Sequence, residues 1–248
     1  MTWLRSLVRG RGAPGLIPFG DALDALGYDG VMGRRQEDVP LSSVVGSMSR
    51  PGDFDQDFRL VNRSLQDCWR RLAGEVRAGL ETPPVDLVQL GELYFVVDGH
   101  HRVSVARSMG RASIPASILR VCTIAYAMCC LRAAHLPSKA AERQFLERVP
   151  LPAAVRDTLW LDRPADWMRL ADDAEAWGFR RAMEARPLTD RAELAQAWWT
   201  AQVTPEVERL RASGAGQDLR DVQVYATALA ARDRLGRLDW APDLADEL

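Results

Sequence analysis

The sequence predicts an α/β (α+β) fold in which a small mixed sheet with covering helices is followed by an all-α region. Strand and helix patterns occur in the order strand, helix, strand, strand, helix, strand between residues 39 and 121. Strand patterns are absent after Cys122. The chain has 248 residues and is 47% hydrophobic, which is enough apolar material for one large core or two modest ones.

The chain is expected to divide into an N-terminal arm at residues 1–36, an α/β domain at residues 37–121 and a tryptophan-rich helical domain at residues 122–248. Glycine and proline recur throughout the arm, and one short helix pattern, DALDALG, lies between them. Prolines separate the helix patterns of the last region. The spacing of Leu194, Ala197 and Trp198 predicts one apolar helical face, so the tryptophans are expected to pack in a core.

Hydrophobic periodicity predicts the elements of the α/β domain. VPLSSVVGS suits a strand, and apolar residues at three- and four-residue intervals from Leu65 to Leu80 predict an amphipathic helix. VDLVQL and LYFVV flank Gly91-Glu92, which predicts a hairpin with a two-residue turn. SIPASILRV suits a last strand.

The segment LYFVVDGHHRVSVARSMG, residues 93–110, predicts an anion site. An apolar strand passes through Asp98-Gly99 into a helix that begins near His100 and ends at Gly110. The unpaired N–H groups and the dipole at a helix N-terminus attract anions, and Arg102 adds a guanidinium suited to phosphate or carboxylate. The alternative is an ordinary strand-turn-helix with a polar cap.

His100 and His101 are expected to contact the ligand, although a histidine at a helix start also caps or packs. A helix N-terminus disfavours imidazolium, so both side chains are expected to be neutral. Asp98 is suited to a ribose hydroxyl or to Mg²⁺ beside phosphates. Aspartate is also common in Asp-Gly turns for conformational reasons alone.

A second candidate segment runs from Ser47 to Phe58. Ser47 and Arg50 are expected near the ligand, below a loop that Phe54 and Phe58 anchor. Two further residues of this loop, Asp55 and Asp57, are candidates for a metal ligand or a general base. The alternative is a solvated acidic loop. An EF-hand is excluded, because phenylalanine occupies the position that needs glycine.

No protein metal centre is predicted. The four cysteines, at positions 68, 122, 129 and 130, lack C-x-x-C spacing, so they are expected to be buried reduced thiols. The formal net charge of −2 gives little support to nonspecific nucleic-acid binding, and no apolar run is long enough to cross a membrane. A cytoplasmic location without membrane partners is therefore expected.

The order of elements and the run Gly99-His100-His101-Arg102 resemble the ParB/sulfiredoxin superfamily over residues 39–121. The equivalent run is G-E-R-R in ParB proteins and G-C-H-R in sulfiredoxins. His100 stands where sulfiredoxins carry their catalytic cysteine, so the resemblance excludes reduction of sulfinic acids. The helical region resembles domains of unknown function that accompany ParB-like units.

The resemblance implies a nucleotide-binding protein for CTP or ATP, with Mg²⁺ as an accompanying ion. NTP hydrolysis or phosphoryl transfer to a small molecule is the implied chemistry, with His100, Asp55 and Asp57 as candidate catalytic residues. The candidate nucleotide-binding residues are Ser47, Arg50, Asp98, Gly99, His100, His101 and Arg102. The alternative is a DNA-associated partition or regulatory protein of the ParB type that uses the nucleotide as a switch. A homodimer is the expected assembly.

Overall fold

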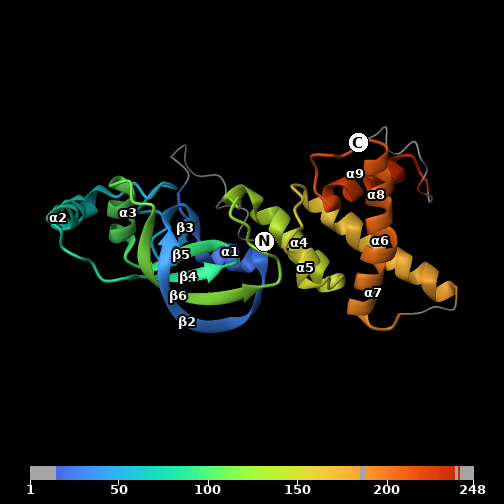
Figure 1. Cartoon of the computed structure of the whole chain (residues 1–248), viewed down its shortest axis with the longest axis horizontal. Helices are drawn as coiled ribbons and strands as arrows, with labels where there is room; N and C mark the ends of the chain where they lie inside the picture. Colours follow the sequence, from blue (N-terminus) through green and yellow to red (C-terminus); the bar gives the residue numbers. More distant parts are fainter. Residues whose placement is uncertain (1–14, 185–187, 238–239, 241–248) are drawn as a thin grey trace. The chain divides into compact units, whose positions relative to one another are not determined.

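The computed structural model describes residues 15–184, 188–237 and 240, which form two compact units (Figure 1). The described part of the first unit comprises residues 15–23, 28–123 and 127–133. The second unit comprises residues 24–27 and 124–126 and the described residues from 134 onward. No helix in these ranges is both long and apolar enough to cross a membrane.

The first unit is built on a six-stranded mixed sheet with the strand order β1-β3-β5-β4-β6-β2. β1 is parallel to β3, β3 to β5 and β4 to β6, whereas β4 is antiparallel to β5 and β2 to β6. The strands and helices of this unit, in which only the first part of α1, up to Leu23, is included, are β1 (Ile17–Pro18), α1 (Phe19–Leu26), β2 (Tyr28–Pro40), β3 (Val44–Ser47), α2 (Gln66–Arg77), β4 (Val85–Leu90), β5 (Leu93–Asp98), α3 (His100–Ser108) and β6 (Ser113–Thr123).

The predicted order of elements over residues 39–121 is confirmed, as β3, α2, β4, β5, α3 and β6. The predicted hairpin is also confirmed, because Leu90 pairs with Leu93 across the Gly91-Glu92 turn. The last strand extends two residues past the predicted boundary at 121, to Thr123. The mixed α/β architecture follows directly from this arrangement of the sheet and its helices.

The predicted N-terminal arm is wrong within its described part. Residues 15–36 do not lie on the domain as an appendage, because β1, α1 and most of β2 belong to them. β2 pairs with β6 from Tyr28 to Pro40, so the predicted boundary at residue 37 falls inside a strand. Most β2 side chains are exposed, so the strand lacks the alternation of apolar and polar residues that sequence analysis detects. Residues 1–14 of the predicted arm lie outside the described residues.

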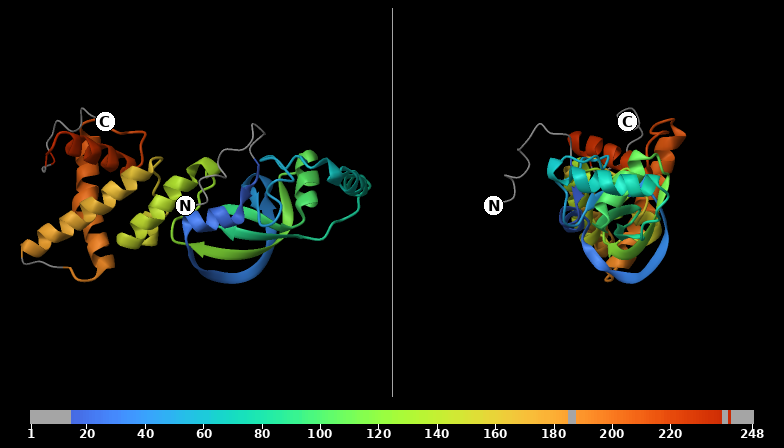
Figure 2. Two further views of the ribbon diagram at one scale, coloured as in Figure 1. Left: turned by 180° about the vertical axis from the view of Figure 1, so that it is seen from behind. Right: turned by 90° about the vertical axis from the view of Figure 1, so that its left-hand side faces the viewer.

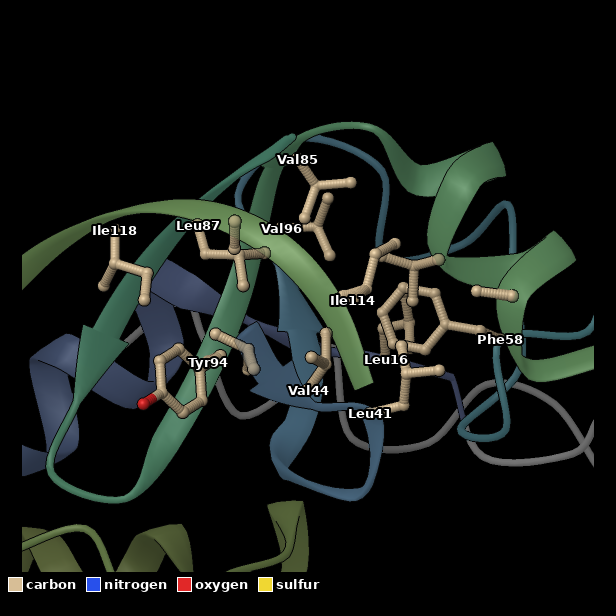
Figure 3. Close-up of a cluster of buried hydrophobic side chains, with 14 of the residues drawn as sticks. Leu16, Leu41, Val44, Phe58, Val85, Leu87, Tyr94, Val96, Ile114 and Ile118 are labelled. Atoms are coloured by element: carbon tan, nitrogen blue, oxygen red, sulfur yellow. The ribbon is translucent and has the colours of Figure 1, made fainter. Parts of the chain in front are cut away.

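One buried hydrophobic cluster of the first unit lies against one face of the sheet (Figure 3). Phe54 and Phe58 from the loop after β3 are each only 1% exposed, so this loop is anchored by two buried aromatic rings as expected. The cluster comprises Leu16, Val39, Leu41, Val44, Phe54, Phe58, Val85, Leu87, Tyr94, Val96, Val103, Ala106, Ile114, Ala116 and Ile118.

Helices α2 and α3 lie side by side at one end of the sheet (Figures 1 and 2). The indole Nε1 of Trp69 on α2 donates a hydrogen bond to Ser104 Oγ on α3, at 2.8 Å. α2 ends at Arg77, earlier than predicted, and Leu80 is 61% exposed instead of contributing to the apolar face of the helix. The chain leaves the helix through Gly79, whose positive φ of 87° is typical of a helix end.

The described part of the second unit is helical, as predicted. Trp167 and Trp198 are 0% exposed and Trp177 is 9% exposed, which confirms that these tryptophans pack in a core. Trp198, Gln202 and Tyr225 all donate hydrogen bonds to the buried carboxylate of Asp173. The helices are α4 (Leu136–Arg148), α5 (Ala153–Arg156), α6 (Pro164–Met183), α7 (Arg191–Trp198), a π-helical turn (Trp199–Val203), α8 (Thr204–Ala212) and α9 (Asp221–Arg234).

The four cysteines are free, but the prediction that they are buried is wrong. Cys68, Cys129 and Cys130 are exposed, and Cys122 is half-buried. Cys68 lies on the outward face of α2, and the adjacent pair lies in a turn after β6, so none of the three is needed to fill a core.

We expect Gly46→Ala to destabilise the first unit by at least about 2 kcal/mol, because a Cβ at this position would collide with the Phe95 ring and the Ile17 carbonyl oxygen. Gly20→Ala is the matched control, since nothing lies within 4 Å of its added Cβ. Urea unfolding of both variants measures the difference. Equal stability of the two variants would contradict the close approach of β1, β3 and β5 at Gly46.

Candidate functional site

A cavity of about 600 Å³ lies at the start of α3. The C-terminal end of β5, the beginning of the loop after β3, one face of α2 and the segment before β4 surround it. Its lining combines charged, imidazole and apolar side chains. The residues that line it are Ser49, Arg50, Leu72, Glu75, Leu80, Glu81, Thr82, Pro83, Val97, Asp98, Gly99, His100, His101 and Arg102.

Gly99 makes the sharp connection between β5 and α3. Its φ of 98° lies in the left-handed region that glycine adopts without strain. A Cβ on Gly99 would also lie 2.6 Å from Val85 Cγ1, so the backbone needs glycine for space as well. Gly99 and the first three residues of α3 line the cavity, and the first N–H groups of a helix have no partner within the helix itself.

Ser47 and His100 form a buried hydrogen bond, with Oγ and Nε2 2.7 Å apart. Ser47 Oγ also accepts hydrogen bonds from the backbone N–H groups of Ser49 and Arg50, at 3.2 and 2.8 Å. A hydroxyl has two acceptor lone pairs and one proton, so the Ser47 proton is directed to His100. His100 Nε2 is therefore an acceptor, and the ring carries its proton on Nδ1.

His100 is neutral over the physiological pH range. Burial is the largest cause that lowers its pKa, from 6.5 to about 4, and the positive charge of Arg50 adds to this effect. Asp98 and Asp53 act in the opposite direction, but they do not compensate for desolvation. The expectation of a neutral histidine is thus met, with burial as the largest cause of the lowered pKa.

His101 is half-buried and lies on the same aromatic platform. The Phe54 ring stacks on His100 and meets His101 edge to face, with ring centroids 6.1 and 5.6 Å apart. Burial, and then Arg50, lower the pKa of His101. His101 Nδ1 is buried without a hydrogen-bond partner among the described residues, which is rare enough to require an explanation.

Arg50 supplies the available positive charge of the site. It is exposed and lines the cavity, and no hydrogen bond or ion pair with the described part of the chain occupies its guanidinium. Ser47 fixes the backbone of Arg50 through the 2.8 Å hydrogen bond to Oγ. The backbone is therefore anchored while the side chain remains available to an anion.

Arg102 lines the cavity, but much of its guanidinium is engaged inside the protein. It donates hydrogen bonds of 2.7 Å to the carbonyl oxygens of Pro83 and Pro84 and forms an ion pair with Asp98. Three of its five N–H donors are thus used to fix the segment before β4 against the start of α3. Only the two remaining N–H donors of Arg102 are left for the predicted contact with phosphate. The positive charge of Arg102 partly neutralises the Asp98 carboxylate.

The structure does not bring Asp55 and Asp57 to the start of α3. The Asp55 carboxylate accepts hydrogen bonds from the backbone N–H groups of Asp57 and Arg59, at 2.9 and 2.8 Å, so it holds the loop in shape. Asp57 pairs with Arg59 and lines a different cavity, beside Trp69 and Arg107. Both aspartates were predicted to lie near the ligand because they are close to Arg50 in the sequence. Distance along the chain does not reveal the direction in which a loop turns, so this prediction failed.

The apolar wall of the cavity was missed by sequence analysis. Leu72 from α2, Leu80 beyond it and Val97 from β5 form this wall, and Glu75 and Glu81 lie beside them. The first four residues of β5 are buried, and Val97, which is 41% exposed, is the first residue of the strand that reaches the surface. Pro83 and Pro84 were the available signal, because a proline pair cannot continue a helix and Pro83 itself lines the cavity.

No cluster of three or more histidine, cysteine, aspartate or glutamate side chains able to hold a metal ion occurs in the described ranges. A bound Mg²⁺ often uses one or two carboxylates and takes its other ligands from water and phosphates. Asp98 adjoins the helix start and its side chain is 71% exposed, so it can approach such an ion despite its contact with Arg102.

We expect the folded first unit to lose stability as pH falls, because His100 has a pKa of 6.5 when unfolded and about 4 when folded. The unfolded chain binds the proton first, so stability is complete above about pH 6.5 and decreases until pH falls through about 4. Between about pH 7.5 and about pH 4.5 the loss attributable to His100 is roughly 2–3 kcal/mol.

Chemical unfolding of the wild type and of His100→Gln at both pH values isolates this contribution, since glutamine does not titrate. The pH dependence should be smaller in the variant by roughly 2–3 kcal/mol. An identical pH dependence in both proteins would mean that His100 is not held neutral by burial.

Two of the solved structures that are similar to this chain are a sulfiredoxin and a ParB-N domain. One is a sulfiredoxin from Arabidopsis thaliana, with a TM-score of 0.28 and 18% identity, covering 36% of this chain and 88% of that chain. The other is a Pnob8-like ParB-N domain, with a TM-score of 0.24 and 16% identity, covering 88% of this chain and 89% of that chain. No protein-family model and no curated protein matches the sequence.

Proposed function

We propose that this protein binds a nucleoside triphosphate, CTP or ATP, in the cavity at the start of α3. The observation that supports this most strongly is the pairing of an available cation with unpaired backbone donors. Arg50 and the first residues of α3 line one cavity, the first N–H groups of a helix suit an anion, and buried Ser47 fixes the backbone of Arg50. This combination suits a phosphate chain.

The opposite wall suits the remainder of a nucleotide. Leu72, Leu80 and Val97 offer apolar surface to a base and a ribose. Glu75 and Glu81 lie beside this surface, and a carboxylate accepts hydrogen bonds from an exocyclic amino group. Cytosine and adenine both carry such a group, and uracil does not. The two sides of the cavity thus match the two chemical parts of CTP or ATP.

Binding, and not turnover, is the function that the geometry favours. His100 Nε2 accepts a hydrogen bond from the Ser47 hydroxyl and the pKa of the ring is about 4, so His100 is a poor general base near neutral pH. Asp55 and Asp57 are occupied outside the cavity. Mg²⁺ enters the proposal only as the ion that accompanies the phosphates, with Asp98 as the carboxylate beside it.

We expect Arg50→Ala to weaken binding of CTP or ATP by about 2 kcal/mol, roughly thirtyfold in Kd, because a charged donor to phosphate is lost. Isothermal titration calorimetry with Mg²⁺ measures the affinity. Arg71→Ala is the matched control, since Arg71 is exposed on α2 and does not line the cavity. UTP should bind more weakly than CTP.

The proposal fails if the wild type binds neither CTP nor ATP, or if the Arg50→Ala and Arg71→Ala variants bind equally well. The alternative, a DNA-associated regulatory or partition protein that uses nucleotide as a switch, predicts a mobility shift with DNA that weakens steeply as salt increases. No shift at low salt, with or without nucleotide, would exclude that alternative.

A further inference from the structure

Strand β2 forms an open edge of the sheet in the first unit. It pairs with β6 on one side, and it is the last strand in the order of the sheet. Figure 1 shows β2 as the lowest ribbon of this unit, with no other ribbon of the unit beyond it. An edge strand presents unpaired N–H and C=O groups to any strand that can align with them.

The part of β2 from Arg34 to Pro40 has the regular geometry that strand addition needs. Its register with β6 is continuous over these seven residues, whereas both register shifts of the strand lie before Arg34. Every residue from Arg34 to Asp38 is exposed except Arg35, which is half-buried. Bulges protect edges from pairing, and here they are confined to the beginning of the strand.

The charges of residues 34–38 are complementary to those of a second copy that runs antiparallel. The sequence Arg34-Arg35-Gln36-Glu37-Asp38 carries two cations, a neutral residue and two anions. A second copy that runs antiparallel, with Gln36 opposite Gln36, places Arg34 opposite the partner's Asp38 and Arg35 opposite the partner's Glu37. Opposite charges directly across a strand pair attract.

This match selects one register. A shift by one residue in either direction leaves only one of the two arginines opposite an acidic residue, because the other then faces Gln36 or Val39. Charges of one sign would make the edge repel its own copy, as edge-protecting charges do. The arrangement in β2 attracts a copy instead.

The existing contacts of these side chains are compatible with pairing. Arg35 and Glu37 share one face of the strand, form hydrogen bonds of 3.0 and 2.8 Å with each other and also contact Gln89 and Tyr94 of their own sheet. Arg34 and Asp38 lie on the other face, where Arg34 makes a distant ion pair of 4.0 Å with Asp86.

We infer that two copies of this chain associate through β2. The two β2 strands pair antiparallel about a two-fold axis at Gln36 and join the two sheets edge to edge into one continuous sheet. The contact is independent of the nucleotide cavity, because its residues do not line that cavity. A two-fold axis repeats each charge pair, so one substitution changes two pairs at once.

Sedimentation equilibrium of the full chain and of charge variants tests this contact. The wild type should form dimers, and Arg34→Asp or Asp38→Arg should each weaken dimerisation about tenfold, because two attractive pairs become repulsive. The double variant Arg34→Asp/Asp38→Arg should recover the wild-type affinity. Arg71→Asp, a charge reversal elsewhere on the surface, should have no effect.

A cysteine at position 36 tests the register. Directly opposed residues of an antiparallel pair have Cα atoms about 4.5 or about 5.5 Å apart, within the range of a disulfide. With Cys68, Cys129 and Cys130 replaced by serine, Gln36→Cys should oxidise to a disulfide-linked dimer much faster than Arg71→Cys. A monomeric wild type at all concentrations, single charge variants that associate like the wild type, or equal oxidation rates for the two cysteines would each overturn the inference.

Discussion

The buried hydrogen bond between Ser47 and His100 is the constraint on which the site depends. It joins the last residue of β3 to the first residue of α3, so two segments 53 positions apart meet at one point. Ser47 Oγ also receives the backbone N–H groups of Ser49 and Arg50, and thereby sets the direction of the following loop. A single hydroxyl thus fixes the helix start and the backbone of Arg50 beside it.

Near the Ser47–His100 hydrogen bond, some side chains hold the structure in place and others remain available to a ligand. Arg102, which has the residue type expected of a phosphate ligand, holds the Pro83-Pro84 segment in place, and Arg50 remains available. Phe54 supports both imidazole rings from the loop side. The cavity therefore has a rigid polar floor and an apolar wall that comes from α2 and the chain beyond it.

The sequence predicted correctly those turns and helix starts whose conformation depends on a few neighbouring residues. The Gly91-Glu92 turn and the Gly99 helix start were identified because each needs particular residues within a few positions. β2 was missed because its partner β6 is far along the chain and its side chains are mostly exposed. The roles of Asp55, Asp57 and Arg102 were misjudged because loop direction and nonlocal hydrogen bonds decide which polar groups are available.

Nitrogen-15 NMR of the histidine side chains tests the central interaction most directly, and with only three histidines the signals are readily assigned. The account predicts that at neutral pH His100 is uncharged, with its proton on Nδ1 and an unprotonated, hydrogen-bonded Nε2. A Ser47→Ala variant should remove that hydrogen bond. A His100 ring that titrates near its ordinary pKa of 6.5, or that carries its proton on Nε2, would contradict the account.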